Sequence, residues 1–131
     1  MNGQVLEIYG DGAQTRDFIF MEDLLDAITR SAAAPDVGGH VFQIATSRET
    51  TVDELTDKLV AILRERGVAG VTVNHVGERA GDVQRNYADT SKAGRMLGWS
   101  AATSLDEGLR ETVNWFLRDY SAGSNQSAGS N

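Results

Sequence analysis

The stretch IYGDGAQTRDFI, residues 8–19, decides how the rest of the chain is read. The turn-forming residues Gly10-Asp11-Gly12 lie between two runs rich in β-branched and aromatic side chains, Val5–Tyr9 and residues 17–20. Such runs are typical of strands, and an Asp-Gly pair between them is typical of a tight turn. We therefore predict two strands joined by a turn, in which the glycines supply positive φ angles.

The remainder of the chain alternates helix and strand signals. We predict a helix over residues 21–33, a short buried strand over 40–45, a helix that begins after Thr51, and a half-exposed strand over 71–76. Two more helices follow, one capped by Asp89 and ended by Gly98, the other beginning at Ser104. Capping boxes in the sequence TVDE, residues 51–54, and SLDE, residues 104–107, mark two of these starts. The predicted class is a mixed α/β domain.

Composition narrows the possible partners. The 131 residues fit one domain with a real core, and 12 basic against 19 acidic residues give a net charge of −7. A phosphate backbone would be repelled by that charge, so we expect no nucleic-acid partner, although a local pair of arginines can still hold one small anion. The chain has no cysteine and therefore no disulfide or thiolate metal site.

The carboxyl-terminal residues form a small polar repeat. The sequence SAGSN at residues 121–125 recurs at 127–131, and such a small polar repeat predicts a flexible tail after a domain of residues 1–120. No apolar run has the length of a membrane span, and the first residues lack the pattern of a signal peptide. We expect a cytoplasmic protein without a membrane partner.

Histidines and large aromatics are predicted to be structural. His40 and His75 are not spaced as metal ligands, so we predict no metal site. Trp99, Trp115 and Phe116 are expected in the core rather than in a stacking platform.

Four motifs in order resemble one protein family. The stretch 8–19 is similar to a segment shared by the extended short-chain dehydrogenase/reductases, the NAD-dependent NDP-sugar epimerases and dehydratases that include UDP-glucose 4-epimerase. The further matches are VFQIAT at residues 41–46, RAGDV at 79–83, and ADTSKA at 88–93 followed by LGW at 97–99 and SLDEGL at 104–109. The chain therefore resembles the substrate-binding, carboxyl-terminal part of such an enzyme, with an incomplete Rossmann-type sheet.

The resemblance implies a nucleotide-sugar site. In that family Arg16 and Arg79 would contact the diphosphate, and Asp82 the nucleoside ribose. Guanidinium forks match phosphate oxygens two at a time, and an ionised carboxylate accepts hydrogen bonds from hydroxyls. The alternatives are a solvated surface pair between Arg16 and Asp17 and a purely structural role for Asp82 in bracing its loop.

The chemistry of the resembled family depends on motifs that this sequence does not contain. The family holds NAD with a Gly-x-x-Gly-x-x-Gly turn and uses a Tyr-x-x-x-Lys pair as acid/base. Here Tyr9, Tyr87 and Tyr120 are followed four residues later by alanine or serine, and no such glycine spacing occurs. We therefore predict no catalytic residue and no bound cofactor on this chain alone, although full-length members of the family use NAD. An epimerase, a dehydratase and a decarboxylase are all compatible with the motifs present.

Two functions follow from this pattern. One is a weak nucleotide-sugar-binding module, with UDP as the first expected nucleotide and dTDP as the second. It is either a remnant or a piece that needs a separate NAD-binding half. The other is a noncatalytic interaction protein that buries its open apolar surface in a homodimer. Three residues depart from the family in the segment 41–46 and just after it: Ala45 and Ser47 replace frequent glycines, and Gln43 replaces a frequent asparagine. A positive φ at Ser47 would be strained.

Overall fold

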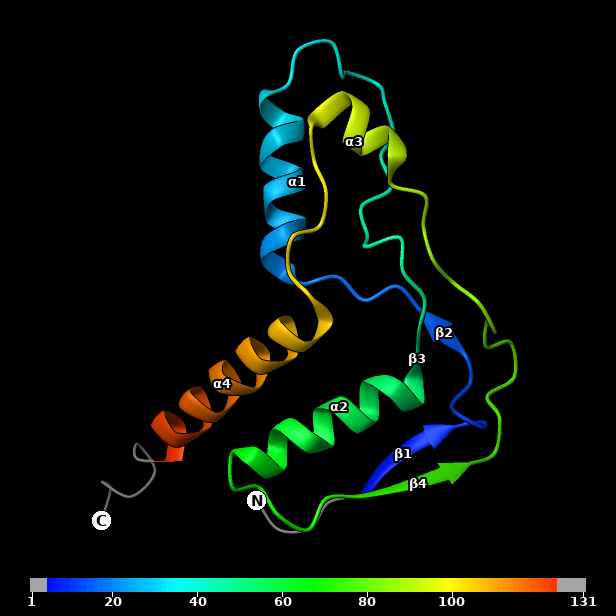
Figure 1. Cartoon of the computed structure of the whole chain (residues 1–131), viewed down its shortest axis with the longest axis vertical. Helices are drawn as coiled ribbons and strands as arrows, with labels where there is room; N and C mark the ends of the chain where they lie inside the picture. Colours follow the sequence, from blue (N-terminus) through cyan, green and yellow to red (C-terminus); the bar gives the residue numbers. More distant parts are fainter. Residues whose placement is uncertain (1–4, 125–131) are drawn as a thin grey trace.

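The computed structural model describes residues 5–124, and their order of elements is that of a mixed α/β domain (Figure 1). The elements are β1 (Val5–Tyr9), β2 (Thr15–Arg16), α1 (Met21–Ala33), β3 (Thr50–Thr51), α2 (Val52–Glu65), β4 (Thr72–Val76), α3 (Ser91–Leu97) and α4 (Leu105–Ser124). The predicted fold class is confirmed. The first four residues of the predicted tail continue α4, and residues 125–131 of that tail lie outside the described residues.

The predicted hairpin around residues 10–12 is wrong. β1 pairs in parallel with β4, from Val5 opposite Thr72 to Tyr9 opposite Val76, and β2 pairs antiparallel with β3. The segment at 17–20 forms no strand, and the side chain of Asp17 in it bonds to two loops instead. Its carboxylate accepts hydrogen bonds from the backbone N–H groups of Thr46, at 2.8 Å, and Ala88, at 3.3 Å, and so ties two distant loops together.

The strand predicted over residues 40–45 is also absent. Phe42 and Ile44 pack against the core as expected for buried apolar residues. No described strand runs beside them, however, and a strand needs a neighbour to pair its backbone groups. Val41 is 80% exposed, and its carbonyl oxygen accepts a hydrogen bond from Lys92 Nζ at 2.9 Å.

Most helix ends match the signals in the sequence. The cap predicted at Asp89 is wrong by one residue, since α3 begins after Thr90, although Asp89 Oδ1 accepts from the backbone N–H of Ser91 at 2.8 Å. Thr51 Oγ1 accepts from the backbone N–H of Glu54 at 3.0 Å, which caps α2. The second capping box is reciprocal, since Glu107 N–H donates to Ser104 Oγ at 3.2 Å and Ser104 N–H donates to Glu107 Oε2 at 3.0 Å. Gly98 ends α3 with a φ of 61°. These local contacts explain why helix boundaries were predictable.

The core forms where α1 meets α3 and the turn after it. Ala27, Ala93, Leu97 and Trp99 are its buried residues, and Trp99 Nε1 donates to the carbonyl oxygen of Asp23 at 3.0 Å. The core position predicted for Trp99 is confirmed. That for Trp115 and Phe116 is wrong, because these two residues of α4 are 56% and 51% exposed. The end of α4 extends away from the body (Figure 1).

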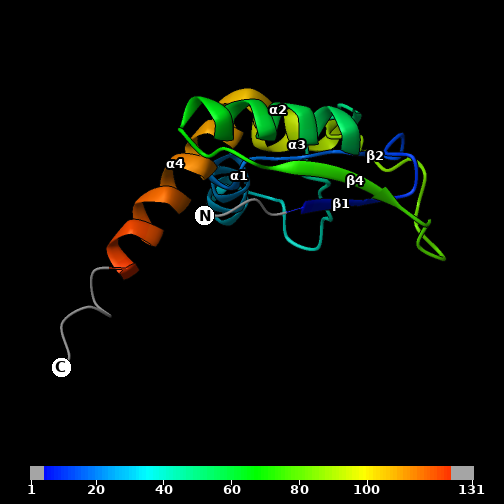
Figure 2. The same ribbon diagram turned by 90° about the horizontal axis from the view of Figure 1, so that it is seen from below.

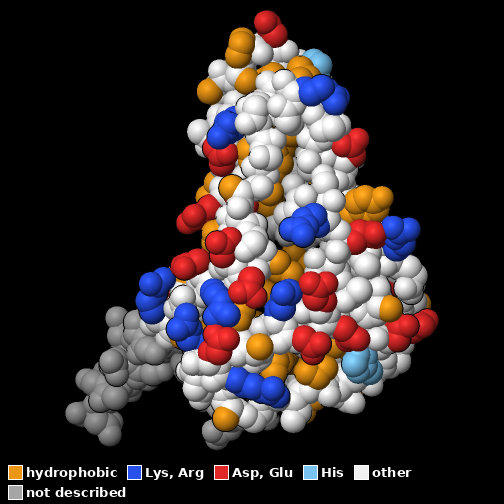
Figure 3. Space-filling view, in the orientation of Figure 1, with side chains coloured by type: hydrophobic (Ala, Val, Ile, Leu, Met, Phe, Trp, Pro, Cys, Tyr) orange, Lys and Arg blue, Asp and Glu red, His pale blue; other side chains and the backbone are white. Residues whose placement is uncertain are grey.

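The arrangement is open on one side. α2 covers one face of the β1–β4 pair, and no helix of the described chain covers the other face (Figure 2). The surface around α2 and α4 mixes acidic and basic side chains (Figure 3). Within residues 5–124 no helix is both long and apolar enough to cross a membrane.

Candidate functional site

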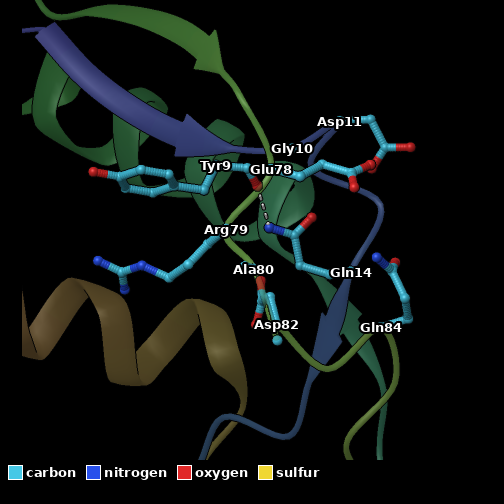
Figure 4. Close-up of a pocket in the computed structure, with 10 residues that line it drawn as sticks. Tyr9, Gly10, Asp11, Gln14, Glu78, Arg79, Ala80, Asp82 and Gln84 are labelled. Atoms are coloured by element: carbon cyan, nitrogen blue, oxygen red, sulfur yellow. Dashed lines mark hydrogen bonds between the residues drawn. The ribbon is translucent and has the colours of Figure 1, made fainter.

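A pocket of about 300 Å³ lies between the turn after β1 and the loop after β4 (Figure 4). Parallel pairing of β1 with β4 places the carboxyl ends of both strands at the same edge, where both of these segments begin. The residues that line the pocket are Tyr9, Gly10, Asp11, Gln14, Glu78, Arg79, Ala80, Gly81, Asp82 and Gln84.

The turn after β1 has a conformation that requires glycine. Gly10 and Gly12 have φ angles of 82° and 78°, so the positive φ predicted for this turn is confirmed although the hairpin is not. A Cβ at Gly12 would lie 2.0 Å from Asp53 Oδ1, at the start of α2. The backbone N–H of Asp53 donates to the Gly12 carbonyl oxygen at 3.1 Å. Close approach to α2 therefore fixes this side of the pocket.

Arg79 lies beside Tyr9 in the pocket (Figure 4). Its guanidinium carbon is 4.8 Å from the centre of the Tyr9 ring, within the range of a cation–π contact. The side chain of Gln14, which is buried, donates to the Tyr9 carbonyl oxygen at 2.8 Å. The ring contact places Arg79 against the end of β1, and Gln14 holds the backbone of Tyr9.

Arg16 and Asp82 form an ion pair. Arg16 Nη1 also donates to the carbonyl oxygens of Thr15, at 2.7 Å, and Val83, at 2.5 Å. The alternative pair of Arg16 with Asp17 does not form, because the Asp17 carboxylate accepts from Thr46 and Ala88 instead. The structure thus brings the three predicted ligand residues to one region, with Arg79 and Asp82 in the pocket lining and Arg16 attached to Asp82.

The charge of the pocket is mixed. Asp11, Glu78 and Asp82 contribute carboxylates to its lining, against the guanidinium groups of Arg79 and the adjoining Arg16. The guanidinium groups of Arg79 and Arg16 attract an anion in this region, whereas the three acidic residues repel it. These opposing charges favour weak rather than tight anion binding.

The loop of the pocket is tied to the β2–β3 pair by Glu49. Its carboxylate accepts from Arg85 Nε at 2.9 Å, Arg85 Nη2 at 2.6 Å and Thr15 Oγ1 at 2.9 Å. The hydrogen bonds from Arg85 and then Thr15 lower the pKa of Glu49 from 4.5 to about 2. Glu49 is therefore ionised throughout the neutral and mildly acidic range.

Three residues of this region were not predicted from the sequence: Tyr9, Gln14 and Glu49. Tyr9 was interpreted as a strand residue and rejected as the tyrosine of a Tyr-x-x-x-Lys pair, and no role was predicted for Gln14 or Glu49. The hydrogen-bond partners of Glu49 lie 34 and 36 positions away along the chain, so no local pattern could have identified it. The motif around Gly10 was the one available signal for Tyr9 and Gln14.

The turn at Ser47 is strained as predicted, with a φ of 58°. Its hydroxyl compensates in part, because Ser47 Oγ lies 2.8 Å from Thr90 Oγ1 and accepts from the Thr90 N–H at 3.3 Å.

The two histidines contact other side chains of the fold. His75 Nε2 lies 2.9 Å from Asp53 Oδ1, and His40 is stacked on Phe42. Among residues 5–124, no three His, Asp or Glu side chains gather as a metal site would require.

The sequence and the fold both match nucleotide-sugar enzymes. The family model for GDP-mannose 4,6 dehydratase matches residues 2–112. The chain is 37% identical over 114 residues to UDP-glucose 4-epimerase of Mycolicibacterium smegmatis, covering 87% of this chain and 35% of that protein. It is 34% identical over 125 residues to dTDP-glucose 4,6-dehydratase of Neisseria gonorrhoeae, covering 89% of this chain and 36% of that protein.

A solved structure gives the same result. UDP-glucose 4-epimerase of Thermotoga maritima with UDP-glucose superposes with a TM-score of 0.79 and 35% identity, over 90% of this chain and 36% of that one. The chain spans about a third of the length of these relatives. Because the family match extends over residues 2–112, this chain belongs to the NAD-dependent epimerase/dehydratase family of nucleotide-sugar enzymes.

Proposed function

We propose that this chain is a weak nucleotide-sugar-binding module that has no catalysis of its own. The supporting observation is the meeting of Arg16, Arg79 and Asp82 at one pocket, from segments more than 60 residues apart in the sequence. In this proposal Arg16 and Arg79 hold the diphosphate and Asp82 accepts from the ribose hydroxyls. The relatives named for UDP-glucose and dTDP-glucose support UDP as the first nucleotide and dTDP as the second.

The affinity should be low for an electrostatic reason. The diphosphate has to displace the Asp82 carboxylate from Arg16, and it approaches two further carboxylates, Asp11 and Glu78. A dissociation constant near 1 mM corresponds to a binding free energy of only about −4 kcal/mol. Two charge-assisted contacts of roughly 1.5–3 kcal/mol each supply only about 3–6 kcal/mol before the cost of association, so binding tighter than this is not expected.

The test is a titration of UDP, UDP-glucose and dTDP into the isotope-labelled chain, followed through backbone amide shifts. We expect saturable shifts around Arg16 and the loop with Arg79 and Asp82. The double variant Arg16→Ala/Arg79→Ala should lose them. Arg64→Ala/Arg118→Ala, on exposed parts of α2 and α4, is the charge-matched control. Equal affinity of the two double variants would refute the proposed site.

The activity of a longer enzyme is a separate proposal. The resembled family uses NAD and a tyrosine–lysine pair, and neither the glycine turn nor that pair occurs in this sequence. We propose that this chain by itself holds no cofactor and that its protein partner is an NAD-binding half. Epimerase, dehydratase and decarboxylase chemistry all fit the carboxyl-terminal motifs. We propose the cytoplasm as the location.

A second function, self-association, is favoured by the exposed apolar face of α1. Met21, Leu25 and Ile28 follow one another at helical spacing and are 61%, 53% and 57% exposed. We propose that a homodimer covers this face and the nearby segment at 40–45. Sedimentation should then show a dimer that Leu25→Asp dissociates and that Ala61→Asp, at an exposed position of α2, leaves in place. A monomer over a wide concentration range would contradict the dimer.

A further inference from the structure

One carboxylate joins the two segments that carry the predicted ligand residues. We infer that Glu49 is a positioning residue, which holds the loop of Arg79 and Asp82 at a fixed place against the strand of Arg16. The inference concerns the placement of this loop, and its consequence for ligand affinity rests on the proposed function.

The contacts at Glu49 are specific in geometry. Arg85 approaches the carboxylate with two nitrogens, Nε at 2.9 Å from Oε1 and Nη2 at 2.6 Å from Oε2. Thr15 Oγ1 donates to Oε1 at 2.9 Å. A bidentate guanidinium fixes direction as well as distance, because both hydrogen bonds must stay in one plane. Glu49 therefore constrains the orientation of Arg85.

The residues that contact Glu49 are close along the chain to Arg16 and Asp82. Thr15 directly precedes Arg16, and Arg85 follows Asp82 by three residues. The backbone N–H of Thr15 also donates to the Gln84 carbonyl oxygen at 2.9 Å. Glu49 itself directly precedes β3, whose Thr50 is opposite Arg16 in the antiparallel pair. One side chain thus links three segments at the point where Arg16 meets Asp82.

An ordinary surface ion pair would not fix the placement of a loop. Such pairs contribute little to stability, because solvent screens them and both side chains lose freedom. Here the Glu49 side chain is 25% exposed, against 69% for that of Arg85, so the acceptor is the more sheltered partner. Loss of the pair should therefore disturb the placement of the loop more than the stability of the whole chain.

The informative variant is Glu49→Gln. The amide oxygen can still accept from Thr15 Oγ1, whereas the bidentate, charge-assisted contact with Arg85 is lost. We expect the Thr15 amide to exchange with solvent about tenfold faster and UDP to bind about fivefold more weakly. The order-of-magnitude basis is the loss of one charge-assisted contact near the site. Glu111→Gln, which changes an exposed glutamate of α4, is the matched control.

A charge exchange separates positioning from general damage. Arg85→Glu alone places two carboxylates together and should weaken UDP at least as much as Glu49→Gln does. The double variant Glu49→Arg/Arg85→Glu restores an ion pair of opposite direction and should recover part of the affinity and of the amide protection. A structural defect unrelated to this pair would not be rescued.

The two readouts distinguish the possible failures. If the native chain binds UDP and Glu49→Gln binds it equally well, the positioning role is overturned while the proposed function stands. If the native chain does not bind UDP, the proposed function fails, and amide exchange in the ligand-free chain decides the inference. Unchanged exchange at Thr15 in Glu49→Gln would then overturn it, and accelerated exchange would support it.

Discussion

Substitution of Gly12 by alanine tests the architecture of the pocket turn. The added Cβ would lie 2.0 Å from Asp53 Oδ1 and 2.2 Å from Asp53 Cγ, where ordinary contacts begin at 3.4 Å. The backbone is held by the N–H of Asp53, which donates to the Gly12 carbonyl oxygen. The Asp53 side chain must therefore rotate away, and its 2.9 Å contact with His75 is lost.

The magnitude is the sum of three costs. Alanine at a φ of 78° costs about 1–2 kcal/mol. Forcing Asp53 from its rotamer costs about 0.5–1.5 kcal/mol. The lost pair with His75 contributes at most about 1 kcal/mol, because both side chains are nearly half exposed. We expect Gly12→Ala to lower the free energy of unfolding by about 2–4 kcal/mol.

Gly39→Ala is the matched control for this experiment. Gly39 has a φ of 80°, and no atom outside its own chain neighbours lies within 4 Å of the position that an added Cβ would take. This variant carries the cost of positive φ alone, and the change in unfolded-state entropy on replacing glycine is common to both variants. In thermal or urea unfolding, Gly12→Ala should be less stable than Gly39→Ala by about 1–2 kcal/mol, or about 4–8 °C in Tm.

The background variant Asp53→Ala makes the comparison a double-mutant cycle. With the carboxylate removed, Gly12→Ala should cost little more than Gly39→Ala, which gives a coupling free energy of about 1–2 kcal/mol between positions 12 and 53. Equal destabilisation by Gly12→Ala and Gly39→Ala, or a coupling near zero, would refute the close approach of this turn to α2.

Three further predictions concern the site and the helix ends. Asp82→Asn should strengthen the binding of inorganic pyrophosphate, because it releases Arg16. If Asp82 accepts from the ribose hydroxyls, calorimetry should show that UDP affinity falls relative to pyrophosphate affinity. Equal changes in the two affinities would favour a bracing role for Asp82. Because the folded-state pKa of Glu49 is lowered from 4.5 to about 2, its stabilising contribution is present above pH 4.5 and is lost as pH falls toward 2; Glu49→Gln should flatten the pH dependence of unfolding in that window, and an unchanged slope would contradict the contact. Ser104→Ala should cost about 1 kcal/mol in urea unfolding through loss of the α4 cap, and no change would contradict that cap.

Local signals explain what was predictable in the fold. The capping boxes at Thr51 and Ser104 and the glycine at 98 act within four residues of the helix end, so the sequence alone located α2, α3 and α4. The motifs around Arg16 and Arg79 likewise indicated the family. They also pointed to Arg79 and Asp82 of the pocket lining, but not to Tyr9, Gln14 or Glu49.

Strand pairing depended on the tertiary structure. Val5–Tyr9 was predicted as a strand, but its partner is β4, more than 60 residues away, and not the segment that follows the glycine turn. The segment at 40–45 has the composition of a strand and is none, because no described strand runs beside it. A helix satisfies its own backbone hydrogen bonds, whereas a strand depends on a neighbour that only the folded chain supplies.

The same distinction holds at the site. The sequence by itself determined which residue types are available, two arginines and an aspartate in family motifs. Only the tertiary structure decided that Arg16 pairs with Asp82, that Arg79 lies on Tyr9, and that Glu49 joins Thr15 to Arg85. The physical reason is that charge and hydrogen-bond energies depend on distances in space of a few ångströms, and residues far apart along the chain acquire those distances only when it folds.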